Sequence, residues 1–179
     1  MAHAIEPGEP DDAALVAAAN RGERSAFGAL YRRHARMVQA VLLARVAPDG
    51  VDDVLHDVFL HAMDRLSSLR DGAAFPSWIA TIARRRAADW RRRRRDTVEL
   101  SEDMPSEPPN EARAEAERAI AAIASLPEAY RETLMLRLVA GLDGPEIAAR
   151  TGLTHGSVRV NLHRGIALLR ERLGGSRDA

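Results

Sequence analysis

The sequence predicts an all-α protein with two small helical domains joined by a flexible acidic linker. Aromatic residues make up only 4% of the 179 residues, whereas alanine and leucine are abundant, and both favour helices. β-Branched runs bounded by turn residues are scarce, which argues against a sheet. Residues 96–111 contain three prolines and six acids with little apolar periodicity. That composition is typical of an extended linker and divides the chain in two.

Four helices are expected in the first domain, residues 11–95. Asp11 or Asp12 can cap a short helix, because a carboxylate accepts hydrogen bonds from the first free backbone amides. A longer amphipathic helix follows and ends before the Pro-Asp-Gly break at residues 48–50. The third helix, residues 51–66, has one apolar face and one acidic face. The fourth buries aromatic and aliphatic residues and then runs into a block of arginines.

A second domain is expected at residues 112–174, with short flexible tails at residues 1–10 and 175–179. Its last part, residues 145–164, reads as two short helices joined by a tight turn. Pro145 suits a first helical position, Gly152 suits the turn, and Thr154 can cap the second helix.

Leu153 is expected to pack in the angle between these two helices. The outward residues of the second helix suit phosphates and base edges, although an ordinary helical hairpin is the alternative.

The formal net charge is zero, but the charges are segregated along the chain. Residues 84–95 hold eight arginines and one acid, and the next stretch, 96–111, holds no base. All 26 basic residues are arginine, and cysteine is absent. The lack of cysteine excludes disulfides and thiolate zinc sites and fits a reducing compartment. Without an apolar run near 18 residues or a signal peptide, we expect a cytoplasmic protein with no membrane span.

Three stretches, in this order, resemble the extracytoplasmic-function sigma factors of bacterial RNA polymerase. DDVLHDVFLHAMDRL resembles the polymerase-binding part of sigma region two. FPSWIATIARRRAADWRRRRR resembles its promoter-melting helix, which reads the minus-ten element. SLPEAYRETLMLRLVAGLDGPEIAARTGLTHGSVRVNLHRGIALLRERL resembles region four. The resemblance implies a protein that binds core polymerase, recognises and melts promoters, and directs transcription initiation.

The resemblance also implies which residues bind the polymerase. An acidic helix face would dock on the clamp of the largest subunit, through Asp52, Asp53, His56 and Asp57. His56 stands where the family usually has glutamine, and Asp57 replaces a frequent glutamate.

For DNA, the resemblance implies two groups of residues. The loop at residues 67–76 would hold an unstacked base, while Arg84, Arg85 and Arg92 would attract the backbone. Arg85 stands where many relatives have asparagine. The residues that would contact the minus-thirty-five element are His155, Arg159, Val160, Asn161, His163 and Arg164. Val160 often corresponds to serine and Asn161 to arginine, so either a changed base preference or weaker binding is open.

The implied partners are core polymerase through its clamp and flap, promoter DNA, and an anti-sigma factor. A sigma-like decoy that binds an anti-sigma factor without touching promoters is the alternative. A helix-turn-helix repressor would leave the acidic helix unexplained, and no catalytic arrangement is present. We expect no cofactor, and four of the six histidines, His34, His61, His155 and His163, lack metal-site spacing. A closed form that covers the arginine block and Arg159 is also compatible with the flexible linker.

Overall fold

The computed structural model describes residues 10–96 and 111–174, and every regular element in these two ranges is helical. The all-α prediction is therefore confirmed. Most of the predicted linker, the tail at 175–179 and nearly all of the tail at 1–10 lie outside the described residues. The N-terminal helices are α1 (Asp12–Asn20), α2 (Arg24–Leu43), α3 (Val51–Arg65) and α4 (Phe75–Asp96). The C-terminal helices are α5 (Glu111–Ala124), α6 (Glu128–Leu138), α7 (Gly144–Thr151) and α8 (His155–Gly174).

Helix α1 is capped as the sequence predicts and is tied to α2 by a partly buried polar cluster. The Asp11 carboxylate accepts a hydrogen bond from the Ala14 backbone N–H at 2.8 Å. The neighbouring Asp12 carboxylate lies 2.9 Å from Arg33 Nη1 and 2.9 Å from His34 Nε2. Burial alone would raise the pKa of Asp12, but His34 and Arg33 outweigh it through hydrogen bonds and charge, so this pKa lies below its usual value.

The start of α3 is fixed against the arginine-rich end of α4. A short 3₁₀ turn, Pro48–Gly50, leads into α3. A Cβ on Gly50 would lie 2.4 Å from the indole of Trp90, so only glycine lets the ring approach this closely. Arg94 stacks 5.0 Å from the Trp90 ring centre and also donates to Asp49 at 2.7 Å. These contacts position the end of α4.

The helix-turn-helix forms with the turn and the second cap that the sequence predicts, and with a capping box at the start of α7 that was not predicted from the sequence. Asp143 and Glu146 make reciprocal hydrogen bonds at the start of α7, and Pro145 occupies its first turn. Gly152 has a φ of 74°, the left-handed conformation that ends α7. Thr154 Oγ1 then accepts a hydrogen bond from the Ser157 N–H at the start of α8.

The angle between α7 and α8 is filled differently from the prediction. Leu153 is exposed, so the expectation that it packs there is wrong. Ile147 of α7 and Val158 of α8 are almost fully buried instead. Ile147 lies midway along α7 and Val158 lies in the first turn of α8, and both reach the core, whereas the residue directly after the glycine turns away from it.

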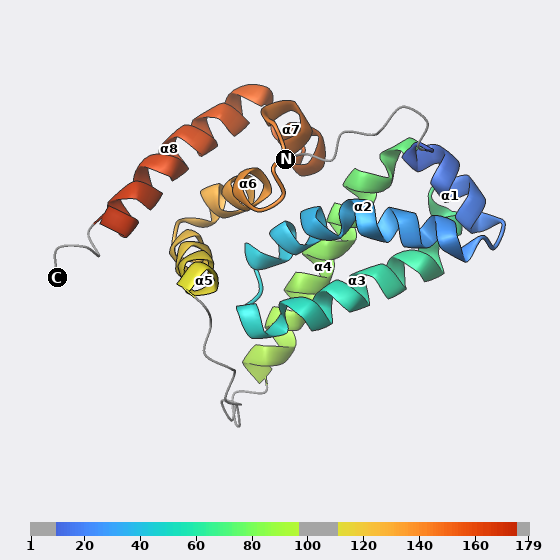
Figure 1. Cartoon of the computed structure of the whole chain (residues 1–179), viewed down its shortest axis with the longest axis horizontal. Helices are drawn as coiled ribbons and strands as arrows, with labels where there is room; N and C mark the ends of the chain where they lie inside the picture. Colours follow the sequence, from blue (N-terminus) through green and yellow to red (C-terminus); the bar gives the residue numbers. More distant parts are fainter. Residues whose placement is uncertain (1–9, 97–110, 175–179) are drawn as a thin grey trace.

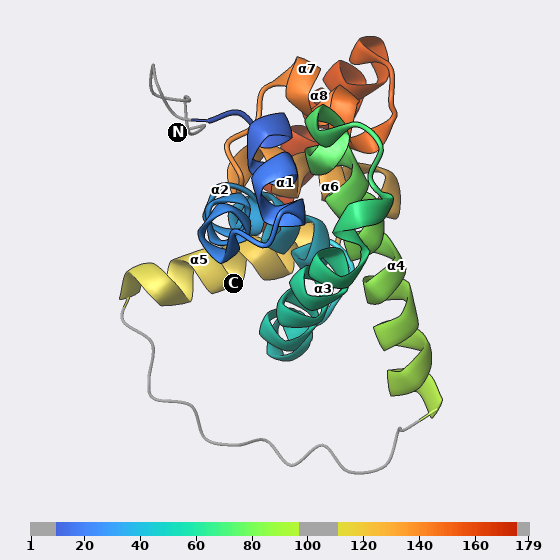
Figure 2. The same ribbon diagram turned by 90° about the vertical axis from the view of Figure 1, so that its right-hand side faces the viewer.

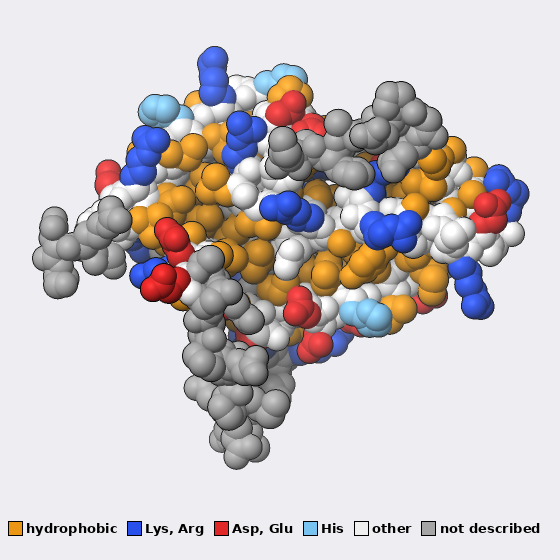
Figure 3. All heavy atoms as spheres, in the orientation of Figure 1, with side chains coloured by type: hydrophobic (Ala, Val, Ile, Leu, Met, Phe, Trp, Pro, Cys, Tyr) orange, Lys and Arg blue, Asp and Glu red, His pale blue; other side chains and the backbone are white. Residues whose placement is uncertain are grey.

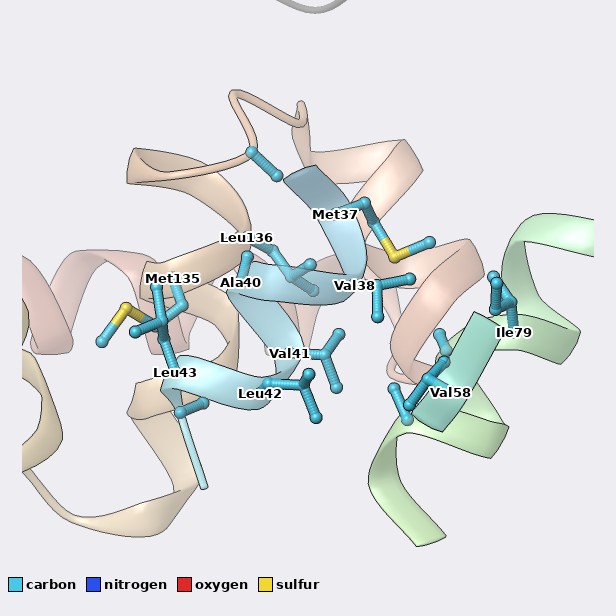
Figure 4. Packing of buried hydrophobic residues seen from close by; sticks show 14 of the residues in the cluster. Met37, Val38, Ala40, Val41, Leu42, Leu43, Val58, Ile79, Met135 and Leu136 are labelled. Atoms are coloured by element: carbon cyan, nitrogen blue, oxygen red, sulfur yellow. The ribbon is translucent and has the colours of Figure 1, made fainter. Parts of the chain in front are cut away.

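Helix α2 lies between the two groups of helices, and α6 packs against it (Figures 1 and 2). Figure 4 shows Met135 and Leu136 of α6 facing the side of α2 that carries Ala40 and Leu43, while Val58 and Ile79 lie on its other side. The buried apolar residues form a cluster that includes members of both groups. Opening the molecule would expose this side of α2.

Candidate nucleic-acid and partner interfaces

The outer face of α3 carries the four predicted polymerase-binding residues. Asp52, Asp53, His56 and Asp57 are all exposed. Within the described part of the chain, these side chains take part in no recorded hydrogen bond or ion pair. Their positions repeat every three or four residues, so they form one continuous stripe along the helix.

Two apolar residues extend this stripe, and the sequence interpretation missed them. Leu60 and Met63 are exposed, and they follow Asp53, His56 and Asp57 at helical spacing. The sequence did hold a signal for them, because neither residue lies on the face of the helix that carries its buried apolar residues. The face therefore combines carboxylates with aliphatic surface, a pattern that suits a protein partner better than DNA.

The arginines of α4 divide into exposed and partly buried residues. Arg85 and Arg91–Arg95 are exposed, with Arg92 bonded to Asp89 one turn away. Arg84 is partly buried, and its guanidinium contacts Glu132 of α6 and the Arg150 backbone carbonyl of α7. The closed form that the sequence left open is thus present at Arg84 but does not cover the rest of the block.

The predicted base-holding loop, residues 67–76, is built from two short 3₁₀ turns, Leu66–Ser68 and Gly72–Ala74. Asp71 caps the second turn by accepting from the Ala73 N–H at 3.0 Å. Phe75 is fully buried at the start of α4, with its ring centre 5.8 Å from that of Trp78. Trp78 packs against the core and is only partly exposed, so its ring supports the fold of α4 and is poorly placed to stack on a base.

The outer face of α8 presents five of its six predicted DNA-binding residues to solvent. Arginine and histidine side chains project along its outer edge (Figure 3). The exposed residues are His155, Arg159, Val160, His163 and Arg164. Asn161 differs, because its amide donates to the Ala129 carbonyl of α6 at 3.0 Å. Arg159 is exposed although the two groups of helices are packed together.

Helix α8 crosses α6 very closely at Gly165. A Cβ at this position would lie 2.9 Å from Leu134 Cδ1 and 3.2 Å from Tyr130 Cβ. A glycine is thus what allows the two helices to approach and fixes the height of α8 above α6. The Asn161 hydrogen bond acts one turn earlier on the same helix.

Within residues 10–96 and 111–174, no three histidine, cysteine or acidic side chains are grouped to hold a metal. Among the helices of these same ranges, none is long and apolar enough to cross a bilayer.

Both groups of helices match known family models. The sigma-70 region 2 model matches residues 30–97, and the sigma-70 region 4 model matches residues 116–169. The sigma factor CarQ of Myxococcus xanthus is 34% identical over 161 residues, which cover 86% of this chain and 92% of CarQ. This chain belongs to the extracytoplasmic-function sigma factors of bacterial RNA polymerase.

Other relatives also align with most of this chain. The ECF sigma factor SigD of Mycobacterium tuberculosis is 32% identical, with 92% of this chain and 85% of SigD covered. The solved structure of CnrH in complex with the cytosolic domain of CnrY has a TM-score of 0.70 at 29% identity, and covers 94% of this chain and 99% of that chain. The sigma factor RpoE from Bartonella quintana, at 21% identity and a TM-score of 0.64, shares the fold.

The resemblance noted in the sequence is confirmed. Members of this family bind core RNA polymerase and promoter DNA, and this chain is a transcription initiation factor of that kind. Its region 2 lies in the N-terminal helices and its region 4 in the C-terminal helices.

Proposed function

We propose that the two groups of helices divide the work of promoter recognition. The N-terminal domain, residues 11–95, docks on core polymerase and holds the opened minus-ten strand. The C-terminal domain, residues 112–174, reads the minus-thirty-five duplex and touches the polymerase flap. Two weak contacts joined by a linker gain affinity through effective concentration, so specific initiation needs both domains.

The docking proposal rests on the outer face of α3, whose polar side chains are exposed and make no recorded contact within the described residues. Asp53, His56 and Asp57 are exposed and have no recorded partner among the described residues, and Leu60 and Met63 continue the face. Exposed carboxylates steer and orient a basic partner, and the aliphatic residues add buried area once the partner is bound.

The DNA contacts follow from the exposed cations. Arg85 and Arg92 on α4 attract the backbone of the opened strand, while Arg159 and Arg164 on α8 contact the duplex. His155, Val160 and His163 lie on the same outer face of α8 and reach base edges. Asn161 takes part once its bond to Ala129 is released, and otherwise orients α8.

We further propose that the protein acts in the cytoplasm without catalytic activity of its own, under the control of an anti-sigma factor. The relative CnrH is solved with the cytosolic domain of CnrY, and 94% of this chain aligns with that structure. A protein that covered the α3 face would block access to polymerase by direct competition.

Run-off transcription with purified core polymerase and a promoter library tests the proposal. Specific start sites that share two upstream elements are expected. A chain that neither associates with core nor directs any start site, yet binds an anti-sigma protein, would be a decoy instead.

Asp57→Arg tests the docking face itself. It should abolish core association and leave thermal unfolding unchanged, because Asp57 is exposed and has no recorded partner. Glu115→Arg on the exposed face of α5 makes the same charge change as a control and should leave core association intact. Equal loss in both variants, or none in Asp57→Arg, would remove the proposed docking face.

A further inference from the structure

A carboxylate bridge joins the two groups of helices. Glu132 of α6 directs one oxygen to Arg84 of α4, with Nε at 2.9 Å, and the other to Arg45 after α2, with Nη2 at 2.8 Å. The side chains of Arg45, Glu132 and Arg84 are only 21%, 13% and 25% exposed. Charged groups that are this well shielded from water interact more strongly than surface pairs.

Backbone carbonyls of the C-terminal helices add to the bridge. Arg84 donates to the carbonyl of Arg150 in the last turn of α7, and Arg36 of α2 donates to the carbonyl of Val139 just after α6, at 2.6 Å. Carbonyls at helix C-termini lack intrahelical partners and carry partial negative charge. The N-terminal helices thus supply arginine donors at these contacts, and the C-terminal helices supply oxygen acceptors.

Arg45 and Arg84 have no recorded acidic partner of their own in residues 10–96. Separation of the two groups would therefore leave two neighbouring guanidinium groups without an anion. A phosphodiester offers them the same chemistry as Glu132, because arginine donates to phosphate and carboxylate oxygens in the same forked geometry. Arg84 also lies beside the exposed Arg85 on the promoter-melting helix.

We propose that Arg45 and Arg84 form a binding site for a backbone phosphate of promoter DNA, and that Glu132 occupies this site while the two domains are packed together. The proposal rests on the proposed function and assigns Arg45, outside the family's promoter-melting segment, to DNA binding. Glu132 is then a competitor of DNA carried by the chain itself.

Promoter geometry requires the domains to separate. The minus-ten and minus-thirty-five elements lie about 25 base pairs apart, or about 85 Å at about 3.4 Å per pair. Domains of this size have a radius of gyration of about 11–12 Å by the usual scaling with chain length. In the packed arrangement α4 contacts α7 directly, so the two DNA-binding faces do not span that distance. DNA that engages both elements must displace Glu132.

Competition makes the affinity for DNA depend on the bridge. The apparent dissociation constant equals the intrinsic value divided by the fraction of open molecules. Glu132→Gln keeps the size of the side chain and removes its charge, so it should raise the open fraction and tighten DNA binding. Glu132→Arg repels both arginines and should do so more strongly.

The test uses the full chain and a fluorescent single-stranded DNA of about 16 nucleotides, followed by anisotropy. Glu132→Gln should bind about fivefold tighter than the unmodified chain. Arg45→Gln is then added to Glu132→Gln, where no bridge is left to break. Loss of a phosphate contact should weaken binding about three- to tenfold and make the salt dependence shallower.

Arg32→Gln in the Glu132→Gln chain is the matched control, because Arg32 is an exposed arginine on α2 outside the site. It should lower affinity much less than Arg45→Gln does. An equal effect of the two changes, or none from Arg45→Gln, would overturn the phosphate site. If the Glu132→Gln variant binds the DNA no tighter than the unmodified chain does, the proposed competition between Glu132 and DNA is overturned. Run-off transcription reports separately on the proposed function. If the chain initiates transcription normally but fails these binding tests, the phosphate site is rejected and the proposed function is kept.

Discussion

Gly165 offers a direct test of how α8 is held for DNA reading. Replacing a mid-helix glycine by alanine ordinarily stabilises a helix by up to about 1 kcal/mol. Here the new Cβ would lie 2.9 Å from Leu134 Cδ1 and 3.2 Å from Tyr130 Cβ. Leu134 is fully buried and Tyr130 Cβ is attached directly to the backbone of α6, so neither atom can move away freely. Overpacking of this kind costs about 1–3 kcal/mol.

Gly165→Ala should therefore destabilise the protein by roughly 0–2 kcal/mol, the difference between these two effects. Gly156→Ala is the control on the same helix, since its nearest neighbour, Thr154 Oγ1, lies 3.9 Å away. Urea unfolding of both variants measures the difference, which should be about 1–3 kcal/mol. Binding to a minus-thirty-five duplex should weaken in Gly165→Ala as α8 shifts. Equal stability of the two variants would show that the close approach at Gly165 is not what sets the position of α8.

Two further predictions concern other parts of the molecule. The pKa of Asp12 is lowered in the folded protein, so its stabilising effect is complete above the usual value of about 3.9 and is lost as the pH falls through the folded value. Acid titration of unfolding should show Asp12→Asn less stable near neutrality, with the gap closing as the pH drops; a constant gap would contradict the linkage. Val160 is 43% exposed on the reading face of α8, which favours contact with a thymine methyl. One thymine-to-uracil change in the minus-thirty-five duplex should weaken binding about fourfold, the value of one methyl group of about 0.8 kcal/mol, and Val160→Ser should abolish this difference.

Most of the fold was predictable because each helix carries its own local signals. Asp11, Pro145, Gly152 and Thr154 all play the capping or turn roles expected of them, and such roles depend only on neighbouring residues. The exposed faces of α3 and α8 followed from helical periodicity in the same way.

The remaining features depend on contacts between residues distant in the sequence. Leu153 is exposed because the core between α7 and α8 is filled by Ile147 of α7 and by Val158 in the first turn of α8. Arg84 is engaged because Glu132, 48 residues later, faces it across the contact between α4 and the C-terminal helices. Likewise, Asn161 bonds a carbonyl 32 residues earlier. Arg45 carried no local signal at all, since an arginine after a helix is most often a solvated end.

The apolar contact between α2 and α6 gives the closed arrangement a dependence on temperature. Ala40 and Leu43 of α2 are buried on the side that faces α6. Apolar contacts weaken on cooling, because the hydration of apolar surface has a large positive heat capacity. Ionic contacts such as the Glu132 bridge do not share this behaviour, so they hold a larger part of the closed state at low temperature. At low temperature the closed arrangement should therefore open more readily, and its stability should depend more strongly on the salt concentration.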